Sequence, residues 1–378
     1  MPALKVLHCI YDDLHNPWVG GGGAVRGWEI YRRVASRLDT SVLCGNYPGA
    51  RDRELEGVRF IHAGAASPYP WSRWTYARAA TRALKRYDYD AAVLDFSAYT
   101  PIPVPAKRPV GMVVSQVTAF TARARWGRLA GAAVAGAERG LLRRGSLFSA
   151  TSEWTASQLE QVVRPGSTVV VVGNGVPGEL FEVERHERDY LLFLGRFDLF
   201  AKGLDTLLDG FARLARERPD LRLVLAGRGK DELRVKELSR RLKIDDRVEV
   251  RRNVGESERA GLLAGALLLV MPSRFEGFGM VAAEAMAAGV PVLAAGAGAL
   301  PEVVGNGGLL VPPGDSAALA RAAATLLDDP GRRRELGQLA RRLARRYSWD
   351  SVAERHLDFV ELVARGARTL PGQTGQAV

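Results

Sequence analysis

Cysteine and histidine are scarce in this chain. Of its 378 residues, two are cysteines (Cys9 and Cys44) and five are histidines. Both cysteines lie in strand-like apolar stretches, where we expect small core residues rather than a disulfide pair. The histidines show none of the spacings of zinc-binding motifs. We therefore expect no metal site, no cofactor and no disulfide framework, which favours a reducing, cytoplasmic location.

Long apolar runs are also absent. The longest candidate, Ala285–Pro301, has 17 residues and is interrupted by Pro291 and three glycines, whereas a membrane-spanning helix needs about 20 apolar residues. The stretch Met1–Ile10 is too short for a signal peptide and is followed at once by Asp12 and Asp13. Both observations agree with a cytoplasmic protein.

Three common catalytic or nucleotide-binding motifs are missing too. The glycine run Gly20–Gly23 does not form Gly-x-Gly-x-x-Gly, which argues against a dinucleotide-dependent dehydrogenase. No Gly-x4-Gly-Lys-Ser/Thr occurs, so a P-loop is excluded, and no Gly-x-Ser-x-Gly nucleophile elbow is present.

Positive charge is abundant and unevenly distributed. The formal net charge is +11, and the segment from Ala65 to Leu147 holds 13 lysines or arginines against four acids. Such an excess attracts phosphates, nucleic acid or anionic lipid. No nucleic-acid-binding module accompanies it, so we expect no nucleic-acid partner. A solvated, arginine-rich surface is the alternative explanation.

Short apolar runs alternate with helical patterns along the whole chain, which indicates parallel sheets covered on both faces. One set occupies residues 1–176 and a second occupies residues 190–345. The polar, aperiodic stretch 177–189 is expected to separate two domains. A final helix over residues 349–365 follows the second set, and residues 369–378 are expected to form a disordered tail. The fold class is therefore α/β, with two doubly wound domains.

Two carboxylates, Glu276 and Glu284, lie eight positions apart. Glu276 is in a turn with Gly277, Phe278 and Gly279 that follows the buried strand Leu267–Met271. Glu284 is on the helix that begins at Met280. Open α/β sheets bind ligands at such strand ends. Neither carboxylate has a lysine or arginine three or four residues away, so local ion pairing does not explain them. The alternative is that both simply favour the helix dipole.

Other candidate ligand-binding residues also follow predicted strands. Arg196 and Lys202 come after the strand Tyr190–Leu194 and stand before a new helix, where cations and exposed amides suit a diphosphate. Gly22 and Gly23 belong to the glycine run, whose backbone amides could approach a phosphate or sugar. Three further candidates end the next two strands of the second set, where they could contact a nucleotide through the backbone: Gly227, Asn253 and Val254.

The pair Glu276 and Glu284, with its flanks PSRFEGFG and EAMAAGVPV, resembles the E-x7-E element of retaining GT-B glycosyltransferases of family 4, the glycosyl transferases group 1. Arg196 and Lys202 resemble that family's GR…KG element, and Gly22 and Gly23 its amino-terminal glycine loop. The resemblance implies two Rossmann-like domains facing a cleft, with residues 1–176 on the acceptor side and residues 190–345 binding the donor. The last helix would cross back to the first domain.

The resemblance also implies a reaction, which is metal-independent transfer of a sugar from a nucleoside diphosphate sugar to an acceptor hydroxyl with retention of configuration. Arg196 and Lys202 would hold the diphosphate, Glu276 the sugar hydroxyls and Glu284 the ribose. One position departs from the family pattern, because Gln116 stands where many members have a histidine that contacts the sugar. Glutamine can still hydrogen-bond a hydroxyl, but it cannot exchange a proton.

The base, the sugar and the acceptor stay open at this stage, as do two alternatives. One keeps the fold and changes the chemistry, to a nucleotide-sugar epimerase or a phosphorylase. The other is a catalytically silent scaffold that binds another transferase. Aromatic residues and cations in Pro68–Tyr76 precede a helix with further cations, which suits the surface of an anionic membrane. We therefore weigh a peripheral location at the inner membrane face, with a lipid-linked acceptor, against an exposed basic helix.

Overall fold

The computed structural model describes residues 3–19, 22–105, 108–122 and 127–366. These residues form two compact units. The first runs to Asn174 and resumes at Trp349, and the second runs from Gly175 to Ser348. None of the described helices combines the length and apolar character needed to cross a membrane. Cys9 and Cys44 are both buried and unbonded, as expected of small core residues.

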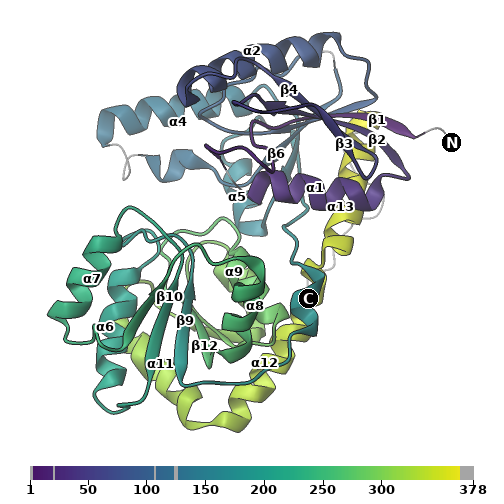
Figure 1. The fold of residues 1–378 in the computed structure, drawn as a ribbon. Helices are drawn as coiled ribbons and strands as arrows, with labels where there is room; N and C mark the ends of the chain where they lie inside the picture. Colours follow the sequence, from purple (N-terminus) through teal and green to yellow (C-terminus); the bar gives the residue numbers. More distant parts are fainter. Residues whose placement is uncertain (1–2, 20–21, 106–107, 123–126, 367–378) are drawn as a thin grey trace. The chain divides into compact units, whose positions relative to one another are not determined.

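The first unit is built on an eight-stranded sheet (Figure 1). Its strand order is β3-β4-β2-β1-β5-β6-β7-β8, and all neighbours are parallel except β3 and β4. The strands are β1 (Leu4–Cys9), β2 (Leu38–Gly45), β3 (Arg53–Leu55), β4 (Val58–Ala63), β5 (Ala91–Asp95), β6 (Val110–Val114), β7 (Leu147–Ala150) and β8 (Thr168–Val171).

Alternate residues of these strands pack into two cores, one on each face of the sheet. On one face the strands meet α1 (Gly22–Val34) and α13 (Trp349–Arg365). On the other they meet α2 (Tyr69–Arg86), α4 (Arg128–Leu142) and α5 (Glu153–Glu160). Figure 1 shows α2 and α4 on the opposite side of the sheet from α1. The first unit is therefore a three-layer α/β/α domain, completed by a helix from the end of the chain.

The second unit has a six-stranded, fully parallel sheet in the order β11-β10-β9-β12-β13-β14. Counted from β9, this is the 3-2-1-4-5-6 order of a doubly wound nucleotide-binding domain. The order reverses between β9 and β12, which are direct neighbours. The strands are β9 (Tyr190–Leu194), β10 (Arg222–Ala226), β11 (Val248–Arg251), β12 (Leu268–Met271), β13 (Val292–Ala295) and β14 (Gly308–Val311).

Helices cover both faces of the second sheet as well. One core contains α6 (Leu204–Ala215), α7 (Glu232–Arg241) and α11 (Ser316–Asp328). The opposite core contains α8 (Glu256–Gly265), α9 (Met280–Ala287), α10 (Leu300–Val304) and α12 (Pro330–Ala344). Because each loop after a strand emerges at the same edge of a parallel sheet, the loops after β9, β10, β11 and β12 are brought together.

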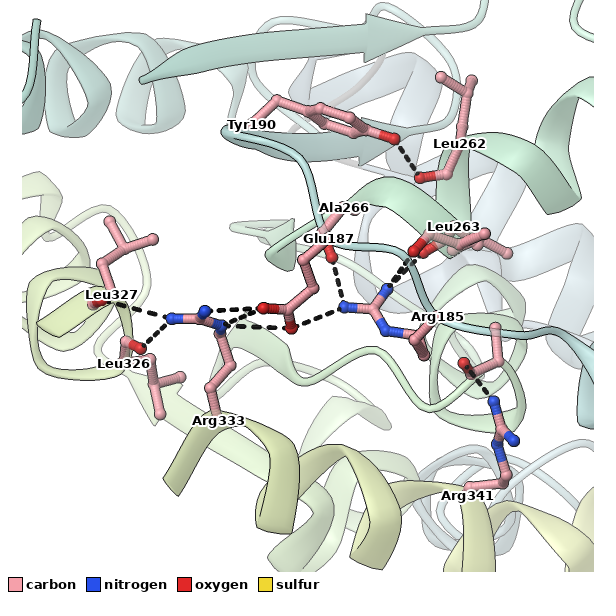
Figure 2. A network of polar contacts seen from close by, with 12 residues as sticks. Arg185, Glu187, Tyr190, Leu262, Leu263, Ala266, Leu326, Leu327, Arg333 and Arg341 are labelled. Carbon is pink, nitrogen blue, oxygen red and sulfur yellow. Dashed lines mark hydrogen bonds and ion pairs between the residues drawn. The ribbon is translucent and has the colours of Figure 1, made fainter. Parts of the chain in front are cut away.

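A network of arginines closes three helix ends in the second unit (Figure 2). The last carbonyls of a helix lack intrahelical partners and carry partial negative charge, which favours capping by cations. Arg185 caps the end of α8, Arg333 the end of α11 and Arg341 the end of α9, and Glu187 joins Arg185 to Arg333. The accepting carbonyls are those of Leu263, Ala264, Ala266, Leu326, Leu327 and Ala288.

Residues 177–189, which we expected to separate the two domains, belong to the second unit. Leu180 and Phe181 are buried in the core of that unit, and Arg185 caps its helix α8. The polar composition of this segment reflects capping chemistry and not a linker. The division of the chain falls after Asn174.

Two helices begin earlier than expected. The helical periodicity of the sequence indicates one helix from about Val25 and another from Trp74, whereas α1 begins at Gly22 and α2 at Tyr69. A proline in the first turn of α2 suits a helix start, since its ring fixes a helical φ and it lacks the N–H that would be unpaired there. The aromatic residues before Trp74 therefore form the first part of α2.

Candidate functional site

Two predicted residues meet at the point where the strand order of the second unit reverses. Lys202 lies in the loop after β9, and Glu276 lies in the loop after β12. The Lys202 Nζ atom is 2.6 Å from Glu276 Oε1, although the two residues are 74 positions apart. Their side chains are 20% and 11% exposed. The absence of a local partner for Glu276 was correctly predicted, but a partner exists across the sheet.

The two loops that carry this pair are fixed to each other. Arg274 donates two hydrogen bonds to the Asp205 carboxylate, at 2.8 and 2.9 Å, and one to the carbonyl of Phe200. Gly203 has a φ of +65°, and an added Cβ would overlap the carbonyl oxygen of Pro272. A side chain at Gly203 would therefore separate the loops. The positions of Lys202 and Glu276 depend on this contact.

Arg196, the third predicted catalytic residue, lies in the same loop as Lys202. Its side chain is exposed. Among the residues that the structure describes, it has no ion-pair partner. Its guanidinium group is therefore free to bind an anion from solution.

A pocket of about 430 Å³ opens at the same edge of the sheet, beside the loops after β9, β10 and β11. It brings together four predicted residues: Gly227, Asn253, Val254 and Glu284. Its other lining residues are Leu194, Gly195, Ala226, Arg228, Arg259 and Val281. Arg196, Lys202 and Glu276 do not line it, although the first two follow the same strand as Gly195.

Glycine is required in the wall of this pocket. Gly227 has a φ of +146°, and an added Cβ would overlap the carbonyl oxygen of Gly195. The loops after β9 and β10 therefore touch through their backbones. Asn253 also has a positive φ, of +52°, a conformation in which asparagine is more frequent than most residues. Backbone atoms thus form much of the wall.

The carboxylate of Glu284 is buried on the side of the pocket formed by α9. The residue is 3% exposed, and Arg259 Nη1 lies 2.7 Å from its Oε1 atom. Its Oε2 atom is buried and has no hydrogen-bond partner among the residues that the structure describes. Burial raises the pKa of Glu284, and the charge and hydrogen bond of Arg259 oppose this shift. An unpaired buried oxygen is costly, so a ligand that donates a hydrogen bond there would be stabilised.

The turn after Glu276 contains one predicted ligand residue with another role. Phe278 is buried in the core and contacts the Tyr347 ring edge-to-face, at 5.2 Å between centroids. Its side chain therefore packs in the core and supports the turn. Gly279 caps α9 with a φ of +100°, which explains a glycine at this position. Gly277 is half-buried in the same turn.

The remaining predicted residues, Gly22, Gly23 and Gln116, lie in the first unit. Gly22 and Gly23 form the first turn of α1 and not a free loop, while Gly20 and Gly21 lie outside the described residues. Gln116 is exposed and follows β6.

An acid next to this helix start was missed. Asp12 accepts a hydrogen bond from the backbone N–H of Ala24, and burial raises its pKa to about 6. One amide of the α1 start, that of Ala24, is therefore bonded to the protein's own carboxyl group.

Arg259 and Arg228 also line the pocket and were not predicted. Arg259 is 25 residues before Glu284 and reaches it from a different helix. No helical or strand spacing connects the two positions, so no local sequence pattern could have identified the pair. Arg228 follows Gly227 directly, and its position after a predicted strand was the one available signal.

Both units of the chain match known protein families. Residues 179–343 match the family model of glycosyl transferases group 1, and residues 21–175 match that of a glycosyl transferase 4-like domain. The chain is 40% identical over 188 residues to an MMP alpha-(1->4)-mannosyltransferase of Mycolicibacterium hassiacum. That match covers 48% of this chain and 46% of the relative, so the chain spans less than half the length of this curated relative.

Solved structures show the same fold over almost the whole chain. A sucrose-phosphate synthase from Thermosynechococcus elongatus is 20% identical, with a TM-score of 0.80, and the match covers 96% of this chain and 100% of that one. Anabaena HepE, solved in complex with UDP, is 20% identical, with a TM-score of 0.71 and coverages of 95% and 100%. The two α/β units form a GT-B fold, and the chain belongs to the glycosyl transferases group 1 family.

Proposed function

We propose that this protein is a retaining glycosyltransferase that moves a sugar from a nucleoside diphosphate sugar to an acceptor hydroxyl without a metal ion. The observation that carries the proposal is the pocket at the strand-order reversal of the second unit. It combines a backbone wall at Gly227 with the buried, unpaired Oε2 atom of Glu284. A neutral donor such as a ribose hydroxyl fits that oxygen.

The sugar and diphosphate would occupy the neighbouring loops. Lys202 and Arg196 follow the strand that leads into the pocket wall at Gly195. As the bond between the sugar and the diphosphate breaks, negative charge grows on the diphosphate. Two cations held beside it would stabilise that charge, which is often the largest contribution to catalysis. They would also take the part that a metal ion plays in other transferases.

Glu276 has a double role in this proposal. In the structure its Oε1 atom is paired with Lys202. Lysine has three donors, so Lys202 can keep this bond and bind a phosphate oxygen. The second carboxylate oxygen of Glu276 would then accept hydrogen bonds from sugar hydroxyls. Asn253 and Val254 would contact the base through their main chain. Gln116, Gly22 and Gly23 of the first unit would lie on the acceptor side.

The proposal is tested by incubating the protein with UDP-, GDP-, ADP- and dTDP-sugars and measuring nucleoside diphosphate release. One donor should be hydrolysed slowly with water as the acceptor, and NMR recorded before the anomers of the released sugar interconvert should show the retained configuration. An inverted product would refute the retaining mechanism, and a catalytically silent scaffold would release nothing. The relatives described above are named as transferases or synthases, which gives no support to an epimerase, a phosphorylase or a scaffold.

We further propose that the first unit contacts an anionic membrane surface through α2, which would bring a lipid-linked acceptor to the enzyme at the inner membrane face. Trp71 and Trp74 are 55% and 47% exposed, and their rings stack 4.7 Å apart. Arg78 lies over the Trp74 ring, and Arg82 is exposed one turn further along the helix. Exposed aromatic residues beside cations are typical of helices at a membrane interface.

Vesicle co-sedimentation tests this contact. Binding should require anionic lipid, weaken with salt and fall when Arg78 and Arg82 are replaced by glutamine, since each such cation contributes about 1 kcal/mol near an anionic surface. Replacing Arg334 and Arg342, two exposed arginines of α12, is the matched control and should change nothing. Equal recovery with neutral and anionic vesicles would contradict the proposal.

A further inference from the structure

In the ion pair formed by Arg259 and Glu284, the two oxygens of the carboxylate have different surroundings. The Arg259 guanidinium occupies one oxygen of the carboxylate and leaves the other, Oε2, buried and without a partner in the described part of the chain. Both side chains line the same pocket, but Glu284 is almost fully buried while Arg259 is about a third exposed. The two oxygens of Glu284 therefore have different tasks, one held by the protein and one available to a ligand.

We propose that Arg259 is a positioning residue of the nucleotide site, which holds the Glu284 carboxylate so that Oε2 accepts a hydrogen bond from a ribose hydroxyl and the site selects nucleotides that carry it. This inference rests on the proposed function, because it needs a nucleotide in the pocket. It assigns to Arg259 a role that acts through Glu284, without requiring that Arg259 touch the ligand.

Two physical arguments support this role. A carboxylate held by one charged donor has a fixed orientation, so the direction of its second oxygen is set before the ligand arrives. An ionised carboxylate also accepts a stronger hydrogen bond than a neutral carboxyl group. Burial disfavours the ionised form of Glu284, and Arg259 is the group that opposes this effect. Without Arg259, the carboxyl group would be both less ordered and more readily protonated.

The other charged groups near Glu284 cannot replace Arg259. Glu256, at the start of α8, adds to the cost of ionising Glu284. Arg228 lines the pocket from the loop after β10, but no hydrogen bond or ion pair joins it to Glu284. The ionised state of Glu284 therefore depends mainly on one arginine.

The test compares three probes that share one base: a ribonucleoside diphosphate and its 2′-deoxy and 3′-deoxy counterparts. The base is the one that binds the wild-type protein most tightly among UDP, GDP and ADP. We expect the wild-type protein to bind one or both deoxy forms about 10- to 100-fold more weakly, because a hydrogen bond to a charged acceptor is lost. In Arg259→Gln the preference for the ribonucleoside diphosphate should shrink. Raising the pH from 6 to 9 should restore part of this preference, and the change with pH should be larger in the variant than in the wild-type protein.

Two further variants separate positioning from other roles. Arg259→Lys keeps the charge and should retain part of the preference. In a Glu284→Gln background, Arg259→Gln should have little additional effect, since residues that act as a unit are not additive. Arg213→Gln, which removes an exposed arginine from a surface pair with Asp209, is the matched control and should behave as wild type.

Several outcomes would overturn the inference. If Arg259→Gln weakens all three probes equally at every pH, Arg259 contacts the nucleotide itself or supports the fold only. If the variant keeps the full preference, Arg259 does not position Glu284. If the wild-type protein binds ribose and deoxyribose forms equally, the oxygen of Glu284 does not receive a ribose hydroxyl. Failure of the wild-type protein to bind any probe would instead refute the nucleotide site and the proposed function with it.

Discussion

Replacing Lys202 with alanine should reduce turnover far more than it reduces stability. Lys202 is the cation nearest to Glu276, at 2.6 Å, and it lies where charge would grow on a departing diphosphate. Loss of one such preorganised group lowers kcat by about 10²- to 10³-fold. The Michaelis constant for the donor should change less, because the lost interaction is strongest in the transition state.

The cost in stability can be worked from the same contact. Both side chains are mostly buried, so the pair lies between an exposed ion pair and a fully buried one. Its loss should cost about 1–3 kcal/mol. For a unit of this size, each kcal/mol lowers the melting temperature by roughly 2–4 °C. The variant should therefore remain folded at 25 °C, where its activity is measured.

The assay is steady-state release of nucleoside diphosphate from the donor that the wild-type protein turns over, with circular dichroism melting in parallel. Lys202→Arg is the matched control, since it keeps the charge, and it should retain more activity than Lys202→Ala. If the two residues act as a unit, the double variant of Lys202→Ala with Glu276→Gln should have nearly the same kcat as the less active of the two single variants. An unchanged kcat in Lys202→Ala would refute this role.

Three further variants test separate parts of the account. Glu276→Gln should abolish transfer with little change in melting, and a variant that stays active but melts several degrees lower would make Glu276 a structural residue. Asp12→Asn should stabilise the protein by about 1–3 kcal/mol at pH 8, because a buried carboxyl with a folded pKa of about 6 and an ordinary value of 3.8 disfavours folding above pH 6. That gain should disappear as the pH falls towards 4, and a variant that is no more stable than wild type at pH 8 would contradict the burial cost. Arg333→Ala should cost about 3–5 kcal/mol, since it leaves the carbonyls of Leu326 and Leu327 without their donor and removes one of the two arginines that hold Glu187. Its exposed neighbour Arg334 should tolerate alanine within about 0.5 kcal/mol in urea unfolding, and equal losses would mean that the arginine network of Figure 2 does not stabilise the second unit.

Local patterns in the sequence were sufficient for much of the fold. The apolar run Tyr190–Leu194 is a strand with the predicted bounds, and Glu284 lies on a helix that begins at Met280 as predicted. These features depend on neighbours within a few residues, which is what apolar periodicity reports. Helix starts were less accurate, since the glycines before Val25 and the aromatic residues before Trp74 do not show helical periodicity.

Contacts between distant segments could not be predicted in the same way. The pairs Lys202–Glu276 and Arg259–Glu284 depend on which strands become neighbours, and that order is set by packing of the whole sheet. Phe278 shows the converse limit, because a residue inside a predicted ligand-binding motif can still pack in the core. Spacing in the sequence places a residue on a loop, but it does not say which way the side chain turns.

The claim that the second unit holds a nucleoside diphosphate against Glu284 is tested most directly by isothermal titration calorimetry. UDP, GDP, ADP and dTDP would each be titrated into the wild-type protein and into Glu284→Ala. We predict that the wild-type protein binds at least one of them with one site per chain, and that Glu284→Ala binds the same nucleotide about 10- to 100-fold more weakly. Equal affinity for both proteins, or no binding to the wild-type protein, would contradict the account.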